Sequence, residues 1–523
     1  MQSVTGPLPS ATARGKALRR EISALGVAAS CEAVDLWAAS RDCSAAALLW
    51  TKARIVPHPP DVVAWPEDVD QVAAVVRLAA QREVPVVPMG GGTGSAGGSI
   101  PLRGGIVLDT QRLTRPLEID LPAGSVQVGA GVSGNRLEEL LAHAGATLGH
   151  FPASLPAATV GGWLATRSAG LLSSRHGSIA DMVLSLEAVN GAGEILRTLE
   201  GPSGGPDLAQ LLLGNEGTLA IFTSARLRIW RRPRGRWVRG VRFPSLRDGL
   251  RCVRDILRAG LHPAIAQLHD PLDTLLAGAD PLRVPQPLRW LVEGAQAEAL
   301  RLSLRAPLLL NRLVDALPAA SLLVLAFDGE SEEYAAHEGE VALAICDRAR
   351  GENLGPAAGE RGLQSMHRAS WAQAPLFAAG AFVEMLDVAT TWERAEALCL
   401  AVRRAAEGLA FVRAQFANAA PEGCALELSL LGFAGAPAEE IARGSRDDAE
   451  ADLEEAQQRR ETALAAALSA VADEGATISH HSGVGASRHV FLRRELGEGI
   501  RQLRALKKAF DPRGILNPGK LLL

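Results

Sequence analysis

The sequence predicts a mixed α+β fold with more than one domain, and three observations support this prediction. At 523 residues the chain exceeds what one hydrophobic core usually organises. Residues 60–98 follow a strand–helix–strand pattern that ends in a cluster of glycines. Short β-rich runs punctuated by Gly and Pro continue to about residue 232, after which a helical texture rich in Ala, Leu, Arg and Glu takes over.

Composition and charge narrow the classes of function. The net charge is only −4 and no Lys/Arg run is interleaved with aromatics, which argues against nucleic acid as the main partner. The six cysteines are scattered without a CxxC pair, so we expect no disulfide framework, no metal site and a cytoplasmic location. No apolar run is long enough for a signal peptide or a bilayer span, although peripheral membrane contact stays open.

The first half of the chain reads as a helical extension followed by a β-rich domain. Residues 1–54 show a helical rhythm and predict an N-terminal helical extension. In the domain at 55–232, a strand is expected at Val62–Trp65, a helix over Val72–Ala79 and a second strand at Val84–Val87. The β-rich runs after them complete the domain.

The second half reads as a separate domain and a returning segment. An Arg/Pro-rich stretch at 228–237 marks the boundary before a cap domain at 233–474. Within it, residues 440–473 predict one long, charged surface helix. The last segment, residues 475–523, again contains several recognisable motifs. The turn at 189–194 predicts a hairpin, because Asn-Gly tolerates the positive φ of tight turns.

The glycine cluster directly follows a strand, and its backbone is suited to an anion. Without side chains, successive N–H groups can converge on a pyrophosphate. A phosphate-binding P-loop is excluded because no Lys lies nearby, and a Rossmann fingerprint because no helix is expected at the glycines. A flexible turn remains the alternative. The cluster consists of Gly90, Gly91, Gly92, Gly94, Gly97 and Gly98.

Two further stretches have the same character. Residues 149–170 combine Pro and Gly with Ser, Thr and Ala, and residues 211–227 place a Gly-Asn-Glu-Gly-Thr sequence at the mouth of a strand. Small residues in such loops let backbone approach a flat ligand. Three such loops in one domain suit an extended dinucleotide better than a small ligand.

Five motifs together resemble the FAD-binding flavoproteins of the vanillyl-alcohol oxidase type, which include D-lactate and glycolate dehydrogenases. They read PVVPMGGGTGSAGG, PASLPAATVGGWLATRSAG, RHGSIADMV, GNEGTLAIFTSARL and DPRGILNPGKL. TVGGWLATRSAG and HHSGVG are most similar to the alkyldihydroxyacetonephosphate synthases. The resemblance implies a two-subdomain, PCMH-type FAD-binding domain, a separate α+β cap domain and a C-terminal segment that returns to the FAD site.

The resemblance also implies which residues hold FAD. Some relatives attach the flavin covalently through a His in or just after the glycine loop. This chain has Thr93 there, so we expect non-covalent FAD. The cofactor-binding residues implied by the motifs are Pro88, Gly90, Gly91, Gly92, Thr93, Gly94, Pro152, Ser154, Thr159, Gly161, Gly162, Thr166, Ser168, Glu216, Gly217, Thr218 and Ile221.

The chain departs from the synthases where those enzymes carry a Tyr, three consecutive His and cap Arg residues. Its single tyrosine, Tyr334, lies far from the matching motif, where Leu426 stands instead. Ser482 replaces the third His, and Gln267 and Gln373 stand where arginines are expected. Leu cannot move a proton, and Gln lacks the charge that grips a phosphate dianion. The usual synthase chemistry is therefore not expected.

His480 and His481 remain as the candidate catalytic residues. A His beside a flavin can take the proton of a substrate hydroxyl while hydride passes to the flavin N5. Arg488 is a candidate partner for a carboxylate, or it forms an ion pair at the surface. His150 and His176 either contact the flavin or substrate or have a structural role.

We expect an FAD-dependent oxidoreductase that acts on a small hydroxy acid or alcohol. The alternatives are a synthase-like transferase of ether-lipid synthesis and a non-catalytic flavin-binding subunit. The resemblance suggests a homodimer, and the electron acceptor stays open.

Overall fold

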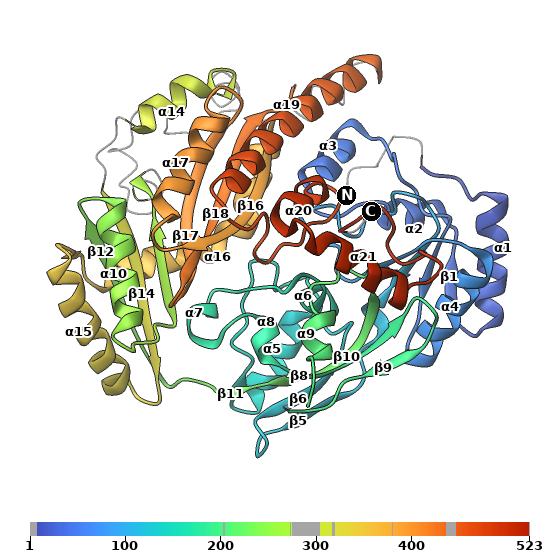
Figure 1. Cartoon of the computed structure of the whole chain (residues 1–523), viewed down its shortest axis with the longest axis horizontal. Coiled ribbons are helices and arrows are strands. Elements are labelled where there is room, and N and C mark those ends of the chain that lie inside the picture. The colour runs from blue at the N-terminus through green and yellow to red at the C-terminus, as the bar shows by residue number, and fades with distance from the viewer. Residues whose placement is uncertain are drawn as a thin grey trace. The chain divides into compact units, whose positions relative to one another are not determined.

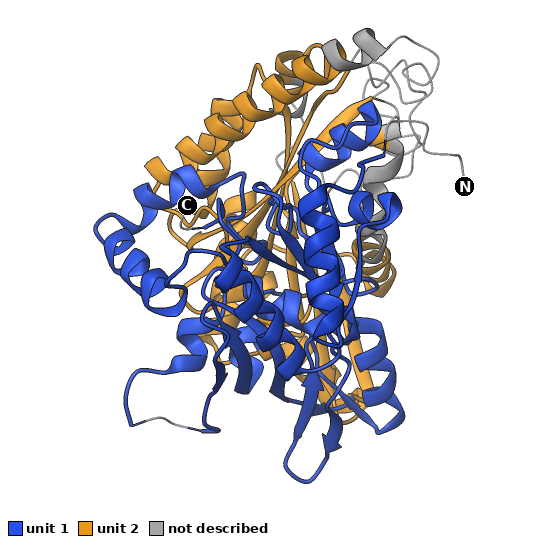
Figure 2. Ribbon diagram, turned by 90° about the vertical axis from the view of Figure 1, so that its right-hand side faces the viewer, with its two compact units in different colours: residues 1–169, 177–232, 481–523 blue, residues 170–176, 233–480 orange. Residues whose placement is uncertain are grey.

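The chain forms two compact units, which Figure 2 colours separately. The computed structural model describes residues 8–201, 204–271, 274, 304–315, 320–378, 380–435 and 446–521. Unit 1 comprises residues 1–169, 177–232 and 481–523, and unit 2 comprises residues 170–176 and 233–480. The change of unit after residue 232 falls inside the Arg/Pro-rich stretch. The sequence gives no sign that residues 170–176 group with unit 2.

Unit 1 contains a four-stranded sheet in the order β1-β2-β4-β3. β1 is antiparallel to β2, whereas β2, β4 and β3 are parallel. The helices α1 to α4 belong to this part of the chain (Figure 1). The bounds are α1 Ala13–Ala24, β1 Ala28–Ser30, α2 Ala33–Ala38, α3 Ala45–Ala53, β2 Val62–Trp65, α4 Val69–Arg82, β3 Val86–Met89 and β4 Ile106–Asp109.

Local chemistry explains α4 and its packing. The side chain of Asp68 caps the helix by accepting a hydrogen bond from the backbone N–H of Gln71 at 2.8 Å. Val72, Val75 and Val76 follow at helical spacing and are fully buried against the sheet. α1 shares this core through residues such as Ile22. The N-terminal segment contains the helices α1, α2 and α3, and it also adds a strand and buried side chains to unit 1.

A second, antiparallel sheet of unit 1 has five strands in the order β5-β6-β10-β8-β9. Its hairpin between β8 and β9 confirms the predicted turn. The positive φ falls at Gly193, however, and Asn190 acts through its side-chain oxygen, which accepts from Ala192 and Glu194. The bounds are β5 Leu117–Asp120, β6 Ser125–Gly129, α5 Gly134–His143, β7 Ala146–Thr147, α6 Val160–Thr166, α8 Ile179–Met182, β8 Val183–Asn190, β9 Ile195–Arg197, α9 Leu208–Leu212, β10 Ala220–Arg228 and β11 Trp230–Arg231.

The C-terminal segment contributes α20 (His489–Leu496) and α21 (Gly499–Phe510) and then joins the first sheet of unit 1. Val86 of β3 donates its N–H to the carbonyl of Ile515 at 2.8 Å. Lys507 on α21 donates to the carbonyls of Thr218 and Leu516, both at 2.7 Å. Residues near the end of the chain are thus part of the same core as residues 62–108.

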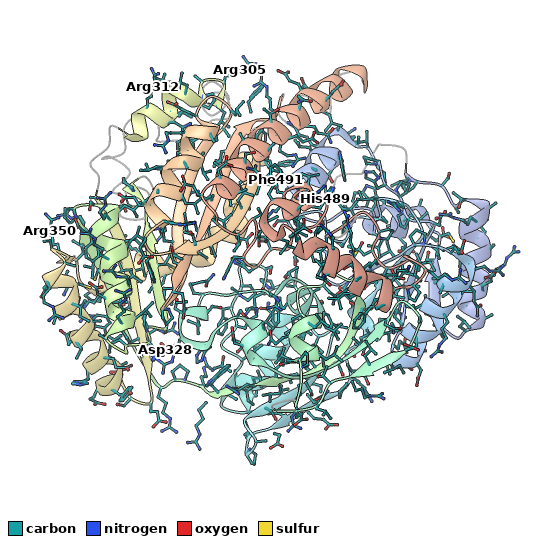
Figure 3. The ribbon with its side chains drawn as sticks, in the orientation of Figure 1. Arg305, Arg312, Asp328, Arg350, His489 and Phe491 are labelled. Atoms are coloured by element: carbon teal, nitrogen blue, oxygen red, sulfur yellow. The ribbon has the colours of Figure 1, made fainter. Side chains whose placement is uncertain are left out.

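Unit 2 is built on a seven-stranded antiparallel sheet in the order β15-β12-β14-β13-β17-β18-β16. On β14, the carboxylate of Asp328 (labelled in Figure 3) accepts two hydrogen bonds from Arg236 of the neighbouring β12. The bounds are α7 Ser173–His176, β12 Gly235–Phe243, α10 Leu246–Arg258, β13 Ile265–His269, α14 Pro307–Asp315, β14 Ser321–Gly329, α15 Glu332–Arg348, β15 Glu352–Asn353, α16 Pro356–Ala378, β16 Ala381–Thr391, α17 Ala395–Ala406, β17 Phe411–Ala420, β18 Gly423–Phe433 and α19 Arg446–Asp473.

The long charged helix is α19, and only part of its surface is solvated. Leu464 and Leu468 are buried, as is Arg460, whose guanidinium lies 2.9 Å from the carboxylate of Glu384 on β16. The expected surface helix is present, but one side of it belongs to the core of unit 2. Residues 440–445 of the predicted helix lie outside the described residues.

The α+β prediction is confirmed by these sheets and helices. Across the described ranges, no helix combines the length and hydropathy needed to cross a bilayer. All six cysteines are free thiols, and the Sγ atoms of Cys252 and Cys346 lie 3.5 Å apart in the core of unit 2.

The buried ion pair between Arg460 and Glu384 provides a test of the packing of α19. Arg460→Met leaves the Glu384 carboxylate buried without its cation and should lower the free energy of unfolding by about 3 kcal/mol in urea titrations. The adjacent exposed Arg459, which pairs with Glu455 and lies 5.5 Å from the centroid of the Phe433 ring, is the matched control, and Arg459→Met should change the free energy of unfolding by less than about 1 kcal/mol. Adding Glu384→Leu to Arg460→Met should recover most of the loss; a loss that persists would contradict the role of the pair.

Candidate flavin site

The glycine loop has backbone amides that the protein itself does not use. In the described chain, no N–H from Gly90 to Gly94 donates a hydrogen bond to another residue. These residues are half-buried, including Thr93. Half-buried donors without a protein acceptor cost free energy unless water or a ligand pairs them. The loop is therefore arranged to receive a ligand rich in acceptors.

The second loop packs directly against the first. A Cβ built on Gly90 would lie 2.3 Å from Oγ1 of Thr159, and one on Gly91 would lie 1.8 Å from the carbonyl oxygen of Ala157. These two glycines are thus required by the contact between the loops, whatever ligand is bound. The tertiary structure brings together two stretches that the sequence implicated separately.

The third loop meets the C-terminal segment through Glu216. Its buried carboxylate accepts hydrogen bonds from the backbone amides of Val484 at 2.6 Å and Gly485 at 2.7 Å. Burial raises the pKa of this carboxyl, opposed by these amides and by the charges of Arg488 and Lys520. Glu216 therefore holds the HHSGVG turn beside the loops of unit 1.

The amides of the third loop serve the fold, unlike those of the first. Glu216 donates its N–H to the carbonyl of Ala165, and Thr218 donates both N–H and Oγ1 to the carbonyl of Asn215. Ile221 is part of the buried core of the four-stranded sheet. A Cβ on Gly217 would clash with Pro88 at 2.2 Å. This loop positions its neighbours, and the amides of Glu216 and Thr218 are already paired within the protein.

Most of the predicted cofactor-binding residues around α6 form hydrogen bonds within the protein. Thr159 caps the helix, accepting from Gly162 at 3.4 Å, and Thr166 returns its hydroxyl to the carbonyl of Gly162. Gly161 donates its N–H to the carbonyl of Ala130, and the carbonyl of Ser168 accepts from Ile179. In the preceding loop, the carbonyls of Pro152 and Ser154 accept bonds within the turn. Gly162 is the most exposed of this group.

Several buried polar atoms next to the glycine loop have no hydrogen-bond partner in the described part of the chain. They include Oγ of Ser99 and Oδ1 of Asn517. The Nδ2 of Asn517 donates to the carbonyls of Gly98 and Glu216, so this side chain is fixed at the loop. Together with the unused amides, these atoms fit a dinucleotide such as FAD, which offers hydroxyl, amide and phosphate groups along its length.

Two residues of this site, Asn517 and Lys520, were not singled out from the sequence. Lys520 is 1% exposed and donates to the carbonyl of Ile100 at the end of the glycine loop. Burial lowers its pKa to about 8, opposed by the charges of Asp42 and Glu216. The only signal was the polar pair within NPGK, placed in an otherwise apolar tail.

His150 and His481 lie in unit 1 and influence one another. His150 is fully buried, and its ring contacts Trp163 edge-on with 4.7 Å between centroids. Burial, and then the charge of His481, lowers the pKa of His150 to about 3, so its ring is neutral at pH 7. His489, labelled in Figure 3 at the start of α20, places Nδ1 2.7 Å from the carbonyl of Ala486.

His480 ends unit 2, where it is held at the edge strand β16. Its N–H donates to the carbonyl of Asp387 at 2.8 Å and to the carboxylate of the same residue at 3.1 Å. Thr477 pairs with Ala389 of the same strand at 3.0 Å. Residues 477–480 thus extend the free edge of the sheet. His176, also in unit 2, has its pKa lowered to about 4, first by burial and then by Arg175.

The interpretation of Arg488 as a surface ion pair is wrong. Its side chain is fully buried in unit 1, and its charge acts on the carboxylate of Glu216. A buried guanidinium beside a buried carboxylate is stabilised by that charge, whereas a surface pair would contribute little.

The departures from the synthase pattern are visible in unit 2. Tyr334 lies on α15 and is 55% exposed, and Leu426 is fully buried on β18. Gln267 donates from Nε2 to the side-chain oxygen of Gln415 at 2.6 Å. Gln373 belongs to α16, but its side chain lies outside the described residues. The described residues hold no group of three His, Cys, Asp or Glu side chains that could bind a metal ion.

Two family models match the chain. The FAD binding domain matches residues 60–199, and the C-terminal domain of the FAD linked oxidases matches residues 232–521. Alkyldihydroxyacetonephosphate synthase of Trypanosoma brucei brucei is 28% identical over 487 residues, which are 91% of this chain and 75% of that protein. Glycolate oxidase subunit GlcD of Bacillus subtilis is 27% identical over 88% of this chain and 89% of its own length. D-lactate dehydrogenase of Archaeoglobus fulgidus is 36% identical over 39% of this chain and 46% of its own length.

Solved structures show the same fold. An alkyldihydroxyacetonephosphate synthase superposes with a TM-score of 0.72 at 20% identity, over 99% of this chain and 88% of that chain. A p-cresol methylhydroxylase with substrate bound superposes with the same TM-score at 15% identity, over 99% of this chain and 98% of that chain. These likenesses extend over an FAD-binding N-terminal domain and a C-terminal oxidase domain.

The buried, neutral His150 makes stability depend on pH. Since the unfolded chain protonates this ring below about pH 6.5 and the folded chain does not, stability falls as pH drops from 6.5 towards 3, by up to about 1.4 kcal/mol per pH unit. His150→Gln should remove this part of the slope between urea titrations at pH 7 and pH 5. The exposed His143, as His143→Gln, should leave the slope unchanged. An unchanged slope in His150→Gln would show that the ring titrates normally in the folded protein.

Proposed function

Because the chain belongs to the family of FAD-linked oxidases, we propose that it is an FAD-dependent oxidoreductase acting on a small hydroxy acid or alcohol. The observation that carries the proposal is the meeting of three glycine-bearing loops with the HHSGVG turn at Glu216. Relatives named D-lactate dehydrogenase and glycolate oxidase subunit support the substrate class.

The reaction divides between cofactor and protein. Bound FAD would supply the hydride acceptor for the carbon that carries the substrate hydroxyl. One of the two histidines of the turn takes the hydroxyl proton, which leaves the oxygen electron pair to form the carbonyl. His481 is the candidate for this role in unit 1, which also holds the three glycine-bearing loops.

His480 is the alternative candidate for the base, and hydrogen bonds to Asp387 hold its backbone in place. The two hydrogen bonds from the N–H of His480 to Asp387 hold the backbone of the turn against β16. A base must be held within hydrogen-bond reach of the proton it removes, so this anchoring supports His480 as the base. Asp387 is then a positioning residue and not the base itself.

A neutral amide pair favours a substrate without a phosphate dianion. Gln267 and Gln415 hydrogen-bond to one another on neighbouring strands, and neither carries a charge. A guanidinium would bind a dianion through two charge-assisted hydrogen bonds, which an amide cannot reproduce.

The proposal predicts that the substrate reduces the flavin. Anaerobic addition of D-lactate, glycolate or a simple alcohol should bleach the visible flavin band of the purified protein for at least one compound. His481→Ala or His480→Ala should slow bleaching by about 100-fold or more, since general-base catalysis contributes about that factor.

The controls are exposed histidines of the same unit. His143→Ala on α5 matches His481, and His262→Ala before β13 matches His480; neither should slow bleaching by more than about twofold. If a bleaching substrate is found but both turn variants keep the wild-type rate, the assignment of the base fails. If no compound of either class bleaches the flavin, the oxidoreductase proposal fails.

The second candidate is a transferase like alkyldihydroxyacetonephosphate synthase, and the identity over 91% of the chain favours it. Exchange of an acyl for an alkyl chain on dihydroxyacetone phosphate, without bleaching, would support this candidate. The exposed Tyr334 and the buried Leu426 argue against it, because neither offers a phenol to the reaction. A third candidate, a flavin-binding subunit without catalysis, predicts neither bleaching nor exchange.

We propose that FAD is held without a covalent bond, because Thr93 stands where some relatives carry the attaching His. Acid precipitation should therefore release the flavin into the supernatant and leave a colourless pellet. FAD fluorescence in the two fractions is the measurement. A yellow pellet that survives repeated acid washes would contradict the proposal.

A further inference from the structure

The N-terminal segment before residue 55 is built into unit 1 on the side of the glycine loop. It lies outside the matched FAD binding domain, which begins at residue 60. Leu36 and Ala39 pack with Val63, Val87 and Val107 of the four-stranded sheet. The short turn after α2, residues 39–44, is therefore fixed to the sheet from which the glycine loop leaves.

This turn contacts the centre of the loop. Cys43 donates its N–H to the carbonyl of Gly94 at 2.9 Å. The neighbouring Asp42 is 6% exposed, and its Oδ1 accepts from the N–H of Ser44 at 2.9 Å. The other oxygen, Oδ2, lies 3.7 Å from the position that a Cβ on Gly94 would take. Within the described residues, Oδ2 has no hydrogen-bond partner.

We propose that Asp42 is a cofactor-binding residue whose Oδ2 donates a hydrogen bond to the FAD held by the glycine loop. A buried oxygen without a partner costs free energy, and the ligand of this loop is the group that can supply one. The proposal rests on the FAD binding that the family implies and not on the redox reaction.

The charges around Asp42 explain why it acts as a donor. Burial raises the pKa of its carboxyl, opposed by hydrogen bonds from Ser44 and by the charge of Lys520. An ionised carboxylate beside a pyrophosphate would repel it, whereas a protonated carboxyl donates to a phosphate oxygen. Arg41 and Cys43 flank Asp42 in sequence, and the buried Lys520 faces it from the C-terminal tail.

The first test is the affinity of apo-protein for FAD, measured by the change in flavin fluorescence on titration. Asp42→Leu removes the donor and should raise Kd about tenfold. Asp42→Asn keeps a donor of similar shape and should stay within about threefold of wild type. Asp120 on β5, which is half-exposed, is the control, and Asp120→Leu and Asp120→Asn should leave Kd unchanged.

A pH series makes the test independent of folding defects in Asp42→Leu. Wild-type Kd should rise with pH as Asp42 loses its proton, whereas Asn cannot titrate, so the ratio of wild-type Kd to Asp42→Asn Kd should increase as the pH is raised. Lys520 is present in both proteins, and its pKa of about 8 is itself raised by the charge of Asp42, so the ratio reports the coupled titration of Asp42 and Lys520.

The outcomes separate this inference from the proposed function. An unchanged Kd in Asp42→Leu, an equal loss in Asp42→Leu and Asp42→Asn, or a ratio that is constant with pH would each overturn the role of Asp42. Wild-type apo-protein that binds no FAD would instead overturn the proposed function. FAD binding without substrate-dependent bleaching would leave the role of Asp42 standing and remove the oxidoreductase.

Discussion

The buried carboxylate of Glu216 is the interaction on which the flavin site depends. It accepts the amides of Val484 and Gly485, and its own backbone sits in the left-handed region with φ +51°. A non-glycine residue in this region costs about 1 kcal/mol, and each of the two hydrogen bonds contributes about 1 kcal/mol. The bonds outweigh the strain, and they join residues that are far apart in the chain.

The glycine-rich loops have different physical tasks, although they look alike in sequence. Gly90 and Gly91 are glycines because the second loop presses on them, and Gly217 because Pro88 does. Among the residues that the structure describes, the amides of Gly90 to Gly94 have no acceptor, whereas those of Glu216 and Thr218 are already paired. One loop is thus arranged to bind, and the third is arranged to hold the binding loop in place.

The HHSGVG turn is anchored at both ends by different means. His480 is bound to Asp387 within unit 2, and Val484 is bound to Glu216 within unit 1. Within each unit, the anchor limits the backbone freedom of the turn residue that it binds, and a catalytic base requires such a fixed position.

The sequence by itself determined the α+β class, the long helix near the C-terminus and the three glycine-bearing stretches, because these follow from periodicity and from residues with special backbone freedom. It could not decide which amides are paired, since pairing depends on partners far along the chain. Only the tertiary structure brought Asp42, Asn517 and Lys520 to the glycine loop and buried Arg488 beside Glu216. No local pattern marks such residues, because burial and long-range hydrogen bonds are properties of the folded chain.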